Sequence, residues 1–272
     1  MEKARSLDSD VIIIDLEDSV EPSEKDKARK SAMSLISSGI IERQEVAIRI
    51  NALSTPWGHT DLEEAVHNGA NIIVVPKISA PKDLIPVRSA ISDSSDIDIW
   101  AMLETPAAMI RALDIAEARM RILPQLSLFI IGTNDLAKDT RAILKPGRAS
   151  YLPWLMNCIA AARAVGIDIL DGVFNDFKDT DGFAEECLQG REIGMNGKTL
   201  IHPGQIGIAN DYFTPTDAEV EWAVKVCETF SNPIYSNAGV ISIEGKMVER
   251  LHADMARRIL EISDACRMRS RV

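Results

Sequence analysis

Polar and charged side chains follow the apolar segments of this sequence at successive places along the chain. The residues concerned are Asp15, Glu17, Asp18, Arg49, Asn51, Lys77, Glu104, Asp135 and Asp171. If the apolar segments are parallel strands of a barrel, their carboxyl ends meet at one rim, where such barrels place their active sites. One charged loop residue is ordinary, but the same pattern after segment upon segment indicates a shared site.

Glu104 and Asp135 are the two carboxylates whose surroundings suit a metal ion. Each comes directly after an apolar segment, and Glu104 precedes Thr105-Pro106, a favourable start for a helix. With no Cys or His ligand nearby in the sequence, oxygen ligands favour Mg²⁺ or Mn²⁺, and Mg²⁺ commonly takes one or two protein carboxylates. The alternative is that each carboxylate caps the helix that follows it.

Arg49 is a candidate for binding a substrate carboxylate. It ends the apolar segment Val46–Ile48, and its guanidinium can bind a carboxylate bidentately, which Lys cannot do. The alternative is a structural pairing with Asp15, Glu17 and Asp18. The two roles are compatible, because acids behind Arg49 can orient the group that holds substrate, and Lys77 has the same two interpretations.

Seven short segments must position these residues. Most are near-continuous apolar runs, as expected of parallel strands that are buried on both faces. They are Asp10–Asp15, Glu45–Ile50, Asn71–Pro76, Asp98–Leu103, Ser127–Ile131, Asp168–Val173 and Asn196–Ile201.

Amphipathic segments between the strands predict helices, and repeated strand–helix units predict right-handed crossovers and a parallel sheet. The expected helices are Ser23–Ser37, Asp61–Asn68, Lys82–Ser92, Pro106–Arg119, Leu152–Val165, Thr180–Gln189 and Thr216–Phe230. A closed (β/α)8 barrel needs eight strands. Seven strands therefore fit an open parallel sheet, or an α/β TIM barrel that lacks its first strand.

The pattern changes after Phe230. A turn-rich stretch leads to the short apolar patch Val240–Ile243, and then to a long expected helix at Lys246–Cys266. We expect a TIM-barrel catalytic domain over residues 1–230 and a C-terminal helical lid or oligomerisation arm over residues 231–272.

Composition excludes several classes of protein. The 272 residues carry 30 basic and 41 acidic side chains, a net charge of −11, which argues against nucleic-acid binding as the main role. The longest apolar runs are far shorter than the roughly 20 residues of a membrane span. Four widely spaced cysteines lack zinc-site spacing and favour a reduced, cytoplasmic protein. Gly197-Lys198-Thr199 lacks the upstream glycine of a phosphate loop, because Glu192 stands there.

Seven motifs in order resemble those of a known family, over about Glu2 to Ile262. They are Asp15-Leu16-Glu17-Asp18-Ser19-Val20, Arg49-Ile50-Asn51, Val75-Pro76-Lys77, Glu104-Thr105-Pro106, Gly132-Thr133-Asn134-Asp135-Leu136-Ala137, Asp171-Gly172-Val173, and Gly197-Lys198 through Ile201-His202-Pro203. The chain is similar to the citrate lyase beta-subunit-like CoA-ester lyases, which include malyl-CoA and citramalyl-CoA lyases of the HpcH/HpaI aldolase superfamily. The Asp15–Asp18 stretch resembles the CoA-ester branch.

The resemblance implies a (β/α)8 barrel and a Mg²⁺-dependent carbon–carbon lyase. The lyase would reversibly cleave a 3-hydroxyacyl-CoA, such as malyl-CoA or citramalyl-CoA, into acetyl-CoA and a keto acid. By that similarity Glu104 and Asp135 hold the metal, with Glu104 also near substrate, and Arg49 binds the keto-acid end. The partners implied are a CoA thioester and a small keto or hydroxy acid, in a homotrimer or homohexamer.

Two departures from the family pattern leave alternatives open. Relatives begin with an extra strand and basic residues near CoA, before the helix expected here at Glu2–Leu7. Their C-terminal segment Gly-Lys-Met-Ile-Asp, whose Asp enters a neighbouring subunit's site, stands here as Gly245–Glu249, so Glu249 is a catalytic candidate with a longer side chain. The alternatives are an acyl-CoA thioesterase or malate-synthase-like activity on the same scaffold, or a non-catalytic barrel subunit.

Overall fold

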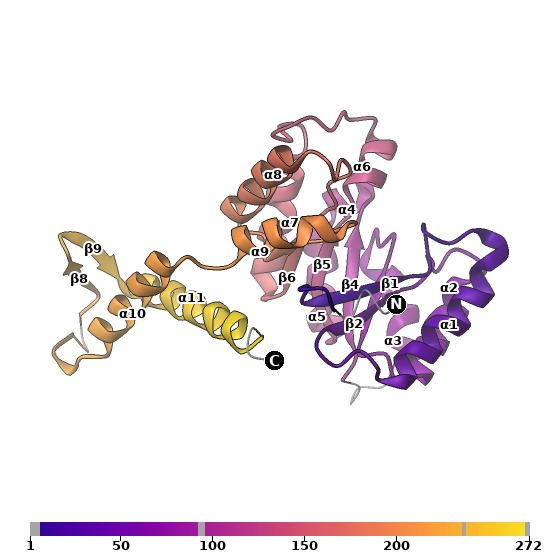
Figure 1. The fold of residues 1–272 in the computed structure, drawn as a ribbon, viewed down its shortest axis with the longest axis horizontal. Coiled ribbons are helices and arrows are strands. Elements are labelled where there is room, and N and C mark those ends of the chain that lie inside the picture. Colours follow the sequence, from indigo (N-terminus) through magenta and orange to yellow (C-terminus); the bar gives the residue numbers. More distant parts are fainter. Residues whose placement is uncertain (1–5, 92–95, 236–237, 270–272) are drawn as a thin grey trace. The chain divides into compact units, whose positions relative to one another are not determined.

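The protein consists of two compact units in the computed structural model, which describes residues 6–91, 96–235 and 238–269 (Figure 1). The units are Met1–Ala209 and Asn210–Val272. Within the described ranges no helix is long and apolar enough to cross a membrane.

The first unit contains a sheet of seven parallel strands, in which each strand pairs with the next along the chain. The strands are β1 (Val11–Asp15), β2 (Glu45–Arg49), β3 (Ile72–Val75), β4 (Asp98–Leu103), β5 (Leu126–Ile131), β6 (Asp168–Asp171) and β7 (Gly197–Lys198). In Figure 1, β1 and β2 run across the direction of β4 and β5, so the sheet curls strongly. Among the described residues β1 does not pair with β7, and the barrel is open.

The two faces of the sheet have different partners because side chains alternate along each strand. The concave face carries a buried apolar cluster made of Ala47, Ile72, Val74, Trp100, Met102 and Ile130. The intervening residues, such as Ile48, Ile73 and Phe129, are fully buried on the other face. On that side of the unit, α7 contacts β5 and β6, while α8 contacts β7.

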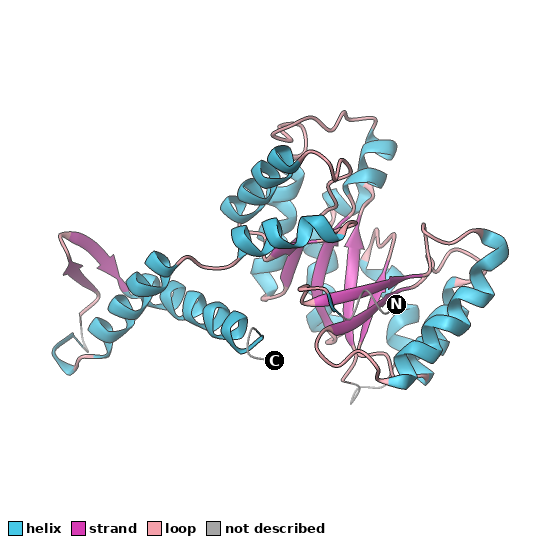
Figure 2. Cartoon of the chain, in the orientation of Figure 1, coloured by secondary structure: helices cyan, strands magenta, loops and turns pink. Residues whose placement is uncertain are grey.

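Helices connect the strands (Figure 2). They are α1 (Lys25–Ser38), α2 (Gly58–His67), α3 (Ile85–Ala90), α4 (Pro106–Ile110), α5 (Ala112–Arg121), α6 (Thr133–Thr140), α7 (Leu152–Val165), α8 (Thr180–Ile193) and α9 (Ile206–Phe213). Short 3-10 helices occupy Pro22–Glu24, Pro81–Leu84, Pro203–Gln205 and Pro233–Tyr235.

The second unit packs α10 (Asp217–Ser231) and α11 (Arg250–Arg269) with a hairpin of β8 (Val240–Ile243) and β9 (Lys246–Glu249). Its core contains Ala223, Val226, Ile241, Ile243, Val248, Ala253 and Ala256. Because α10 packs against α11, the division between the units falls between Ala209 and Asn210. The sequence pattern places the change later, after Phe230.

The seven predicted strands are confirmed, but several boundaries differ. The helix expected from Lys246 begins at Arg250, because Glu244 and Gly245 adopt left-handed φ values of 51° and 78° and form a two-residue hairpin turn. The expected helix from Pro106 is interrupted at Arg111, and α6 and α9 were not predicted. Most of the expected helix at Glu2–Leu7 lies outside the described residues.

Candidate active site

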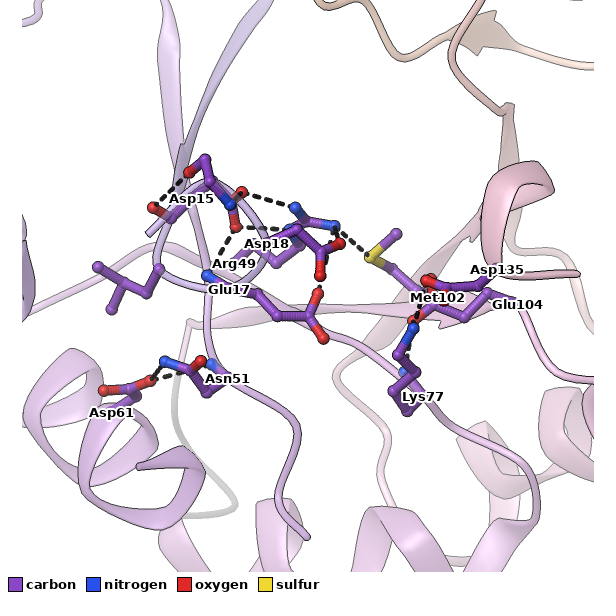
Figure 3. Close-up of polar contacts among 12 residues, drawn as sticks. Asp15, Glu17, Asp18, Arg49, Asn51, Asp61, Lys77, Met102, Glu104 and Asp135 are labelled. Atoms are coloured by element: carbon purple, nitrogen blue, oxygen red, sulfur yellow. Dashed lines mark hydrogen bonds and ion pairs between the residues drawn. The ribbon is translucent and has the colours of Figure 1, made fainter. Parts of the chain in front are cut away.

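Strand alternation places the predicted site residues on the concave face. Asp15 lies two residues beyond Ile13, Arg49 two beyond Ala47, and Glu104 two beyond Met102, so each continues its strand's concave row. The apolar interior of the barrel thus ends in charged side chains at the carboxyl ends of the strands. Figure 3 shows these side chains facing one another from β1, β2 and β4.

Arg49 is enclosed by the acids that follow β1. Its Nε donates to Asp15 Oδ1 at 2.7 Å and its Nη2 to Asp15 Oδ2 at 2.6 Å. Nη1 lies 3.3 Å from Glu17 Oε2 and 3.4 Å from Asp18 Oδ2. Burial lowers the pKa of Arg49, but its bonds to Asp15 and the nearby negative charges outweigh burial and raise it overall. The guanidinium is therefore a fixed positive charge.

A buried lysine holds the acidic loop in place. Lys25 Nζ donates to the carbonyl of Leu16 at 2.8 Å and to that of Glu17 at 2.6 Å, and it lies 5.5 Å from the ring centre of Trp57. Glu17 N in turn donates to Asp15 Oδ1 at 2.8 Å. These bonds fix the backbone that presents the acids to Arg49.

Glu17 is a buried carboxylate without a hydrogen bond to Oε2 among the described residues. Burial raises its pKa to about 7, and the nearby charge of Arg49 opposes this only in part. Glu17 thus holds its proton much more tightly than an exposed glutamate.

The segment after β2 is anchored from α2. Asp61 Oδ2 accepts from Asn51 N at 2.9 Å and from Asn51 Nδ2 at 2.6 Å, and Asp61 Oδ1 accepts from Arg29 Nε at 2.5 Å. Asp61 is 1% exposed. This buried bridge fixes the chain two residues beyond Arg49.

Glu104 and Asp135 lie together on the other side of the site, with Lys77 (Figure 3). Lys77 has a left-handed φ of 58°, and its backbone N donates to Glu104 Oε1 at 2.8 Å. Its Nζ bonds to Asp135 Oδ2 and lies 3.7 Å from Glu104 Oε1. Burial raises the pKa of Glu104 to about 7 against the opposing charge of Lys77. Lys77 therefore contacts both carboxylates directly.

Gly132 allows Glu104 to approach β5. A Cβ at position 132 would lie 2.5 Å from Glu104 Oε2, a distance that side chains do not tolerate. Gly132 N donates to Leu103 O at 3.1 Å, and α6 starts at the next residue. A side chain at position 132 would displace Glu104.

These groups line a cavity of about 230 Å³ within the first unit. Its polar lining includes Asp15, Asp18, Arg49, Glu104, Thr133, Asn134, Asp135 and Thr199. Its apolar lining comes from Ile13, Val74, Met102, Ile130, Ile131, Val173, Leu200 and Ile201. The cavity can take a small ligand that has charged groups on one side and apolar groups on the other.

The first turn of α6 also faces this cavity. The first backbone bond of α6 joins Leu136 N to Gly132 O, so the N–H groups of Thr133, Asn134 and Asp135 have no acceptor within the helix. Thr133 is 2% exposed, and its Oγ1 makes no hydrogen bond among the described residues. These donors can receive an anionic oxygen.

Two family models match the chain. The model described as HpcH/HpaI aldolase/citrate lyase matches residues 1–203, and the C–C bond lyase model of the TIM-barrel fold matches residues 146–266. The chain belongs to the HpcH/HpaI aldolase/citrate lyase family. The predicted family, its barrel fold and its carbon–carbon lyase chemistry are thereby confirmed.

Relatives of this family cover nearly the whole chain. A (3S)-malyl-CoA thioesterase of Cereibacter sphaeroides is 40% identical over 97% of this chain and 90% of its own length. Citrate lyase subunit beta of Escherichia coli is 31% identical over 93% of this chain and 85% of its own.

Solved structures show the same fold. RipC from Yersinia pestis is 30% identical with a TM-score of 0.69, over 79% of this chain and 94% of its own. CitE from Mycobacterium tuberculosis, in complex with magnesium, acetoacetate and coenzyme A, is 24% identical with a TM-score of 0.75, over 96% of this chain and 91% of its own.

The pair Glu104–Asp135 fits a hard divalent cation. Both carboxyl groups contact Lys77 and both line the cavity. Carboxylate oxygens are the donors that Mg²⁺ prefers. Mg²⁺ held by two carboxylates would take water and substrate oxygens as its other ligands. The described ranges contain no cluster of three or more His, Cys, Asp or Glu side chains suited to a metal.

Asp171 does not line the cavity, and Glu249 belongs to the second unit. Asp171 was expected at the rim, but it follows Leu170 of the concave row and therefore points to the helix side, where it is fully buried with Arg148 and Lys198. Glu249 ends β9 in the second unit, where its N–H donates to His252 Nδ1, and it does not lie in the final helix.

The sequence interpretation missed Lys25, Asp61, Gly132 and Arg148. Lys25 and Asp61 lie in helices, where charged residues are usually exposed. Only tertiary contacts reveal that these two are buried. Gly132 directly follows β5, three residues before the predicted metal ligand Asp135, and a glycine at such a place commonly marks a close backbone approach.

Proposed function

We propose that the protein is a Mg²⁺-dependent lyase that reversibly cleaves a 3-hydroxyacyl-CoA, such as malyl-CoA or citramalyl-CoA, into acetyl-CoA and a keto acid. The observation that carries the proposal is the placement of Glu104 and Asp135 in one cavity with Arg49. The Mycobacterium tuberculosis neighbour is in complex with coenzyme A and acetoacetate, which supports this substrate class.

The charge of the site supports a divalent cation. Asp15, Glu17, Asp18, Glu104 and Asp135 outnumber the two cations Arg49 and Lys77. An acidic substrate approaching this set meets excess negative charge, which Mg²⁺ would offset. When bound, Mg²⁺ would polarise the substrate oxygens and lower the pKa of the hydroxyl group.

Arg49 and the first turn of α6 are the proposed binding groups for the keto-acid end. Asp15 takes Nε–H and one Nη2–H of Arg49. The Nη1 donors make only longer contacts, to Glu17, Asp18 and Met102 Sδ at 3.3, 3.4 and 3.9 Å, which a substrate carboxylate can replace. A fixed positive charge held before substrate arrives stabilises developing negative charge without reorganisation. Asp15, Glu17, Asp18 and Lys77 support this arrangement by fixing Arg49 and the carboxylate pair.

Cleavage also moves two protons. The hydroxyl loses a proton as the carbon–carbon bond breaks and the keto group forms, and the enolate of the thioester must gain one at carbon. Glu249 is the residue proposed to exchange protons with substrate in these steps. Asp18 is a second carboxylate to consider, because it is exposed, lines the cavity and lies 3.4 Å from Arg49.

The test is a Mg²⁺-dependent assay of acetyl-CoA and keto-acid release over a panel of 3-hydroxyacyl-CoA esters. Glu104→Gln and Asp135→Asn should each abolish the metal-dependent release while far-UV circular dichroism stays unchanged. Full activity in either variant would refute the metal pair. Exposed Glu63 on α2, changed to Gln, is the matched control and should keep full activity.

A thioesterase is the second candidate, because the Cereibacter sphaeroides relative is named a (3S)-malyl-CoA thioesterase. Hydrolysis releases free CoA and the intact hydroxy acid, whereas cleavage releases acetyl-CoA and a keto acid. Synthase-like activity would form free CoA from acetyl-CoA and a keto acid. The same panel, together with an incubation of acetyl-CoA with a keto acid, separates the three when the CoA species are read by chromatography. The expected homotrimer or homohexamer is tested by light scattering of the full chain.

A further inference from the structure

A buried ionic cluster lies on the helix side of β6 and β7. Arg148 Nη1 donates to both oxygens of Asp171 at 2.7 Å, and Lys198 Nζ donates to Asp171 Oδ2 at 3.0 Å and to Glu186 Oε1 at 2.6 Å. The side chains of Asp171 and Lys198 are fully buried and that of Arg148 is 1% exposed. Burial would raise the pKa of Asp171, but the charges of Lys198 and Arg148 hold it below its ordinary value.

Two cations and two anions make this cluster neutral, yet stability alone does not explain it. Well-packed apolar side chains of similar volume stabilise a core at least as well as a buried ion network. What apolar side chains cannot do is hold particular backbone groups in a fixed place.

The cluster fixes the turns that follow β6 and β7. Lys198 Nζ donates to Gly172 O at 2.6 Å, and Gly172 N donates to Asp171 Oδ1 at 2.9 Å. Thr199 donates to Asp171 O through both its N and its Oγ1, at 3.0 Å each. Val173 and Thr199, at the ends of these turns, line the cavity.

Gly172 transmits this position to α6. A Cβ on Gly172 would lie 2.7 Å from Ile131 O and 2.8 Å from Thr133 Oγ1, so the backbone of Gly172 packs directly on the start of α6. Asp135 lies two residues after Thr133, in the same helical turn. The other end of the α6 connection is held too, because Arg148 belongs to the segment that leads from α6 to α7.

We propose that the Arg148–Asp171–Lys198–Glu186 cluster is a positioning device that sets the first turn of α6, and through it the Asp135 carboxylate against Glu104. The residues act through Gly172 and Thr133 and do not touch substrate. This inference rests on the proposed metal pair, and it predicts that metal affinity depends on residues on the far face of the sheet.

The test is a titration of the full chain with Mn²⁺, followed by electron paramagnetic resonance of free Mn²⁺, which needs no turnover. Asp171→Asn leaves both cations without their shared carboxylate, and Gly172→Ala pushes a methyl group onto Thr133. Each should weaken Mn²⁺ binding at least about tenfold, as loss of supporting contacts does at other metal sites. Steady-state kinetics should show that both variants need more Mg²⁺ than the wild-type chain for half-maximal activity. High Mg²⁺ should partly restore their activity.

Asp168→Asn is the control, because Asp168 is an ion-paired aspartate at the start of the same strand, three residues before Asp171. It should leave Mn²⁺ affinity within about threefold. Wild-type affinity in folded Gly172→Ala and Asp171→Asn would overturn the inference. If Asp171→Asn does not fold, Gly172→Ala alone decides. Failure of the wild-type chain to bind Mn²⁺ would instead refute the metal pair itself.

Discussion

Asp15 and Arg49 are direct neighbours in the register of β1 and β2, and their side chains form two parallel hydrogen bonds of 2.7 and 2.6 Å. The pair stands where the apolar rows of both strands end. Its formation therefore follows from strand pairing, and the guanidinium is oriented before any ligand arrives.

We expect Arg49→Lys to lower kcat/KM by at least about 100-fold, comparable to losing one fixed donor to developing negative charge. Lysine keeps the charge but cannot bind Asp15 and a substrate carboxylate through a planar fork. The measurement is steady-state kinetics of acetyl-CoA release. Arg43→Lys, at a half-exposed arginine paired with Asp8, is the control, and near-normal activity in Arg49→Lys would contradict the assignment.

Gly132→Ala should displace Glu104 and remove Mg²⁺-dependent activity. Gly132 does not have a left-handed φ, so the cost comes from the clash of the new methyl group with the Glu104 carboxylate. Gly207→Ala in α9 meets nothing within 4 Å and should leave activity intact. Thermal unfolding and activity are measured side by side, and an active Gly132→Ala would show that Glu104 need not stay where it is.

Lys25→Met should free the acidic loop. Removing the ammonium leaves the carbonyls of Leu16 and Glu17 without their buried donor, which costs about 2 kcal/mol of the free energy of unfolding. We expect a several-fold rise in KM as Asp15 and Glu17 lose their fixed positions. Lys27→Met, at an exposed lysine of the same helix, should change neither quantity. Urea unfolding and substrate titration check both, and an unchanged KM would confine Lys25 to a structural role.

The rows of apolar residues made the sheet and the rim predictable. Strand alternation and the chain order of charged residues were enough to place Asp15, Arg49, Glu104 and Asp135 at one cavity, because parallel strands share a carboxyl end. Asp171 shows the limit of that reasoning: a shift of one residue along β6 turns a side chain from the cavity to the helices. Whether Leu170 or Asp171 faces inward depends on register, which short strands do not reveal.

Contacts between distant segments could not be predicted. Lys25, Asp61 and Arg148 acquire their roles from residues far along the chain, and nothing local distinguishes them from exposed charges. The second strand of the hairpin, Lys246–Glu249, was hidden by its helix-compatible residues, although Gly245 was a visible turn signal.

The raised pKa of Glu17 predicts how the free energy of unfolding of the metal-free protein responds to pH. Burial raises its pKa to about 7, whereas the unfolded chain has an ordinary glutamate value near 4.3. Between these values the folded state binds more protons than the unfolded state, so the free energy of unfolding falls as pH rises through the window. The raised pKa of Glu104 acts in the same direction. The lowered pKa values of Asp15 and Asp171 act below this window, where they cause loss of stability as pH falls.

We therefore expect Glu17 alone to lower the stability in EDTA by about 3 kcal/mol between pH 5 and pH 8, because about 1.4 kcal/mol is lost per pH unit between pH 5 and its pKa of about 7. Glu104 adds to this fall. Glu17→Gln cannot ionise and should flatten this slope, while Glu63→Gln on the exposed face of α2 should not. Urea unfolding at pH 5, 6, 7 and 8 measures the slope. A slope that is the same in Glu17→Gln and in the wild-type chain would show that Glu17 is already ionised in the folded protein at pH 5.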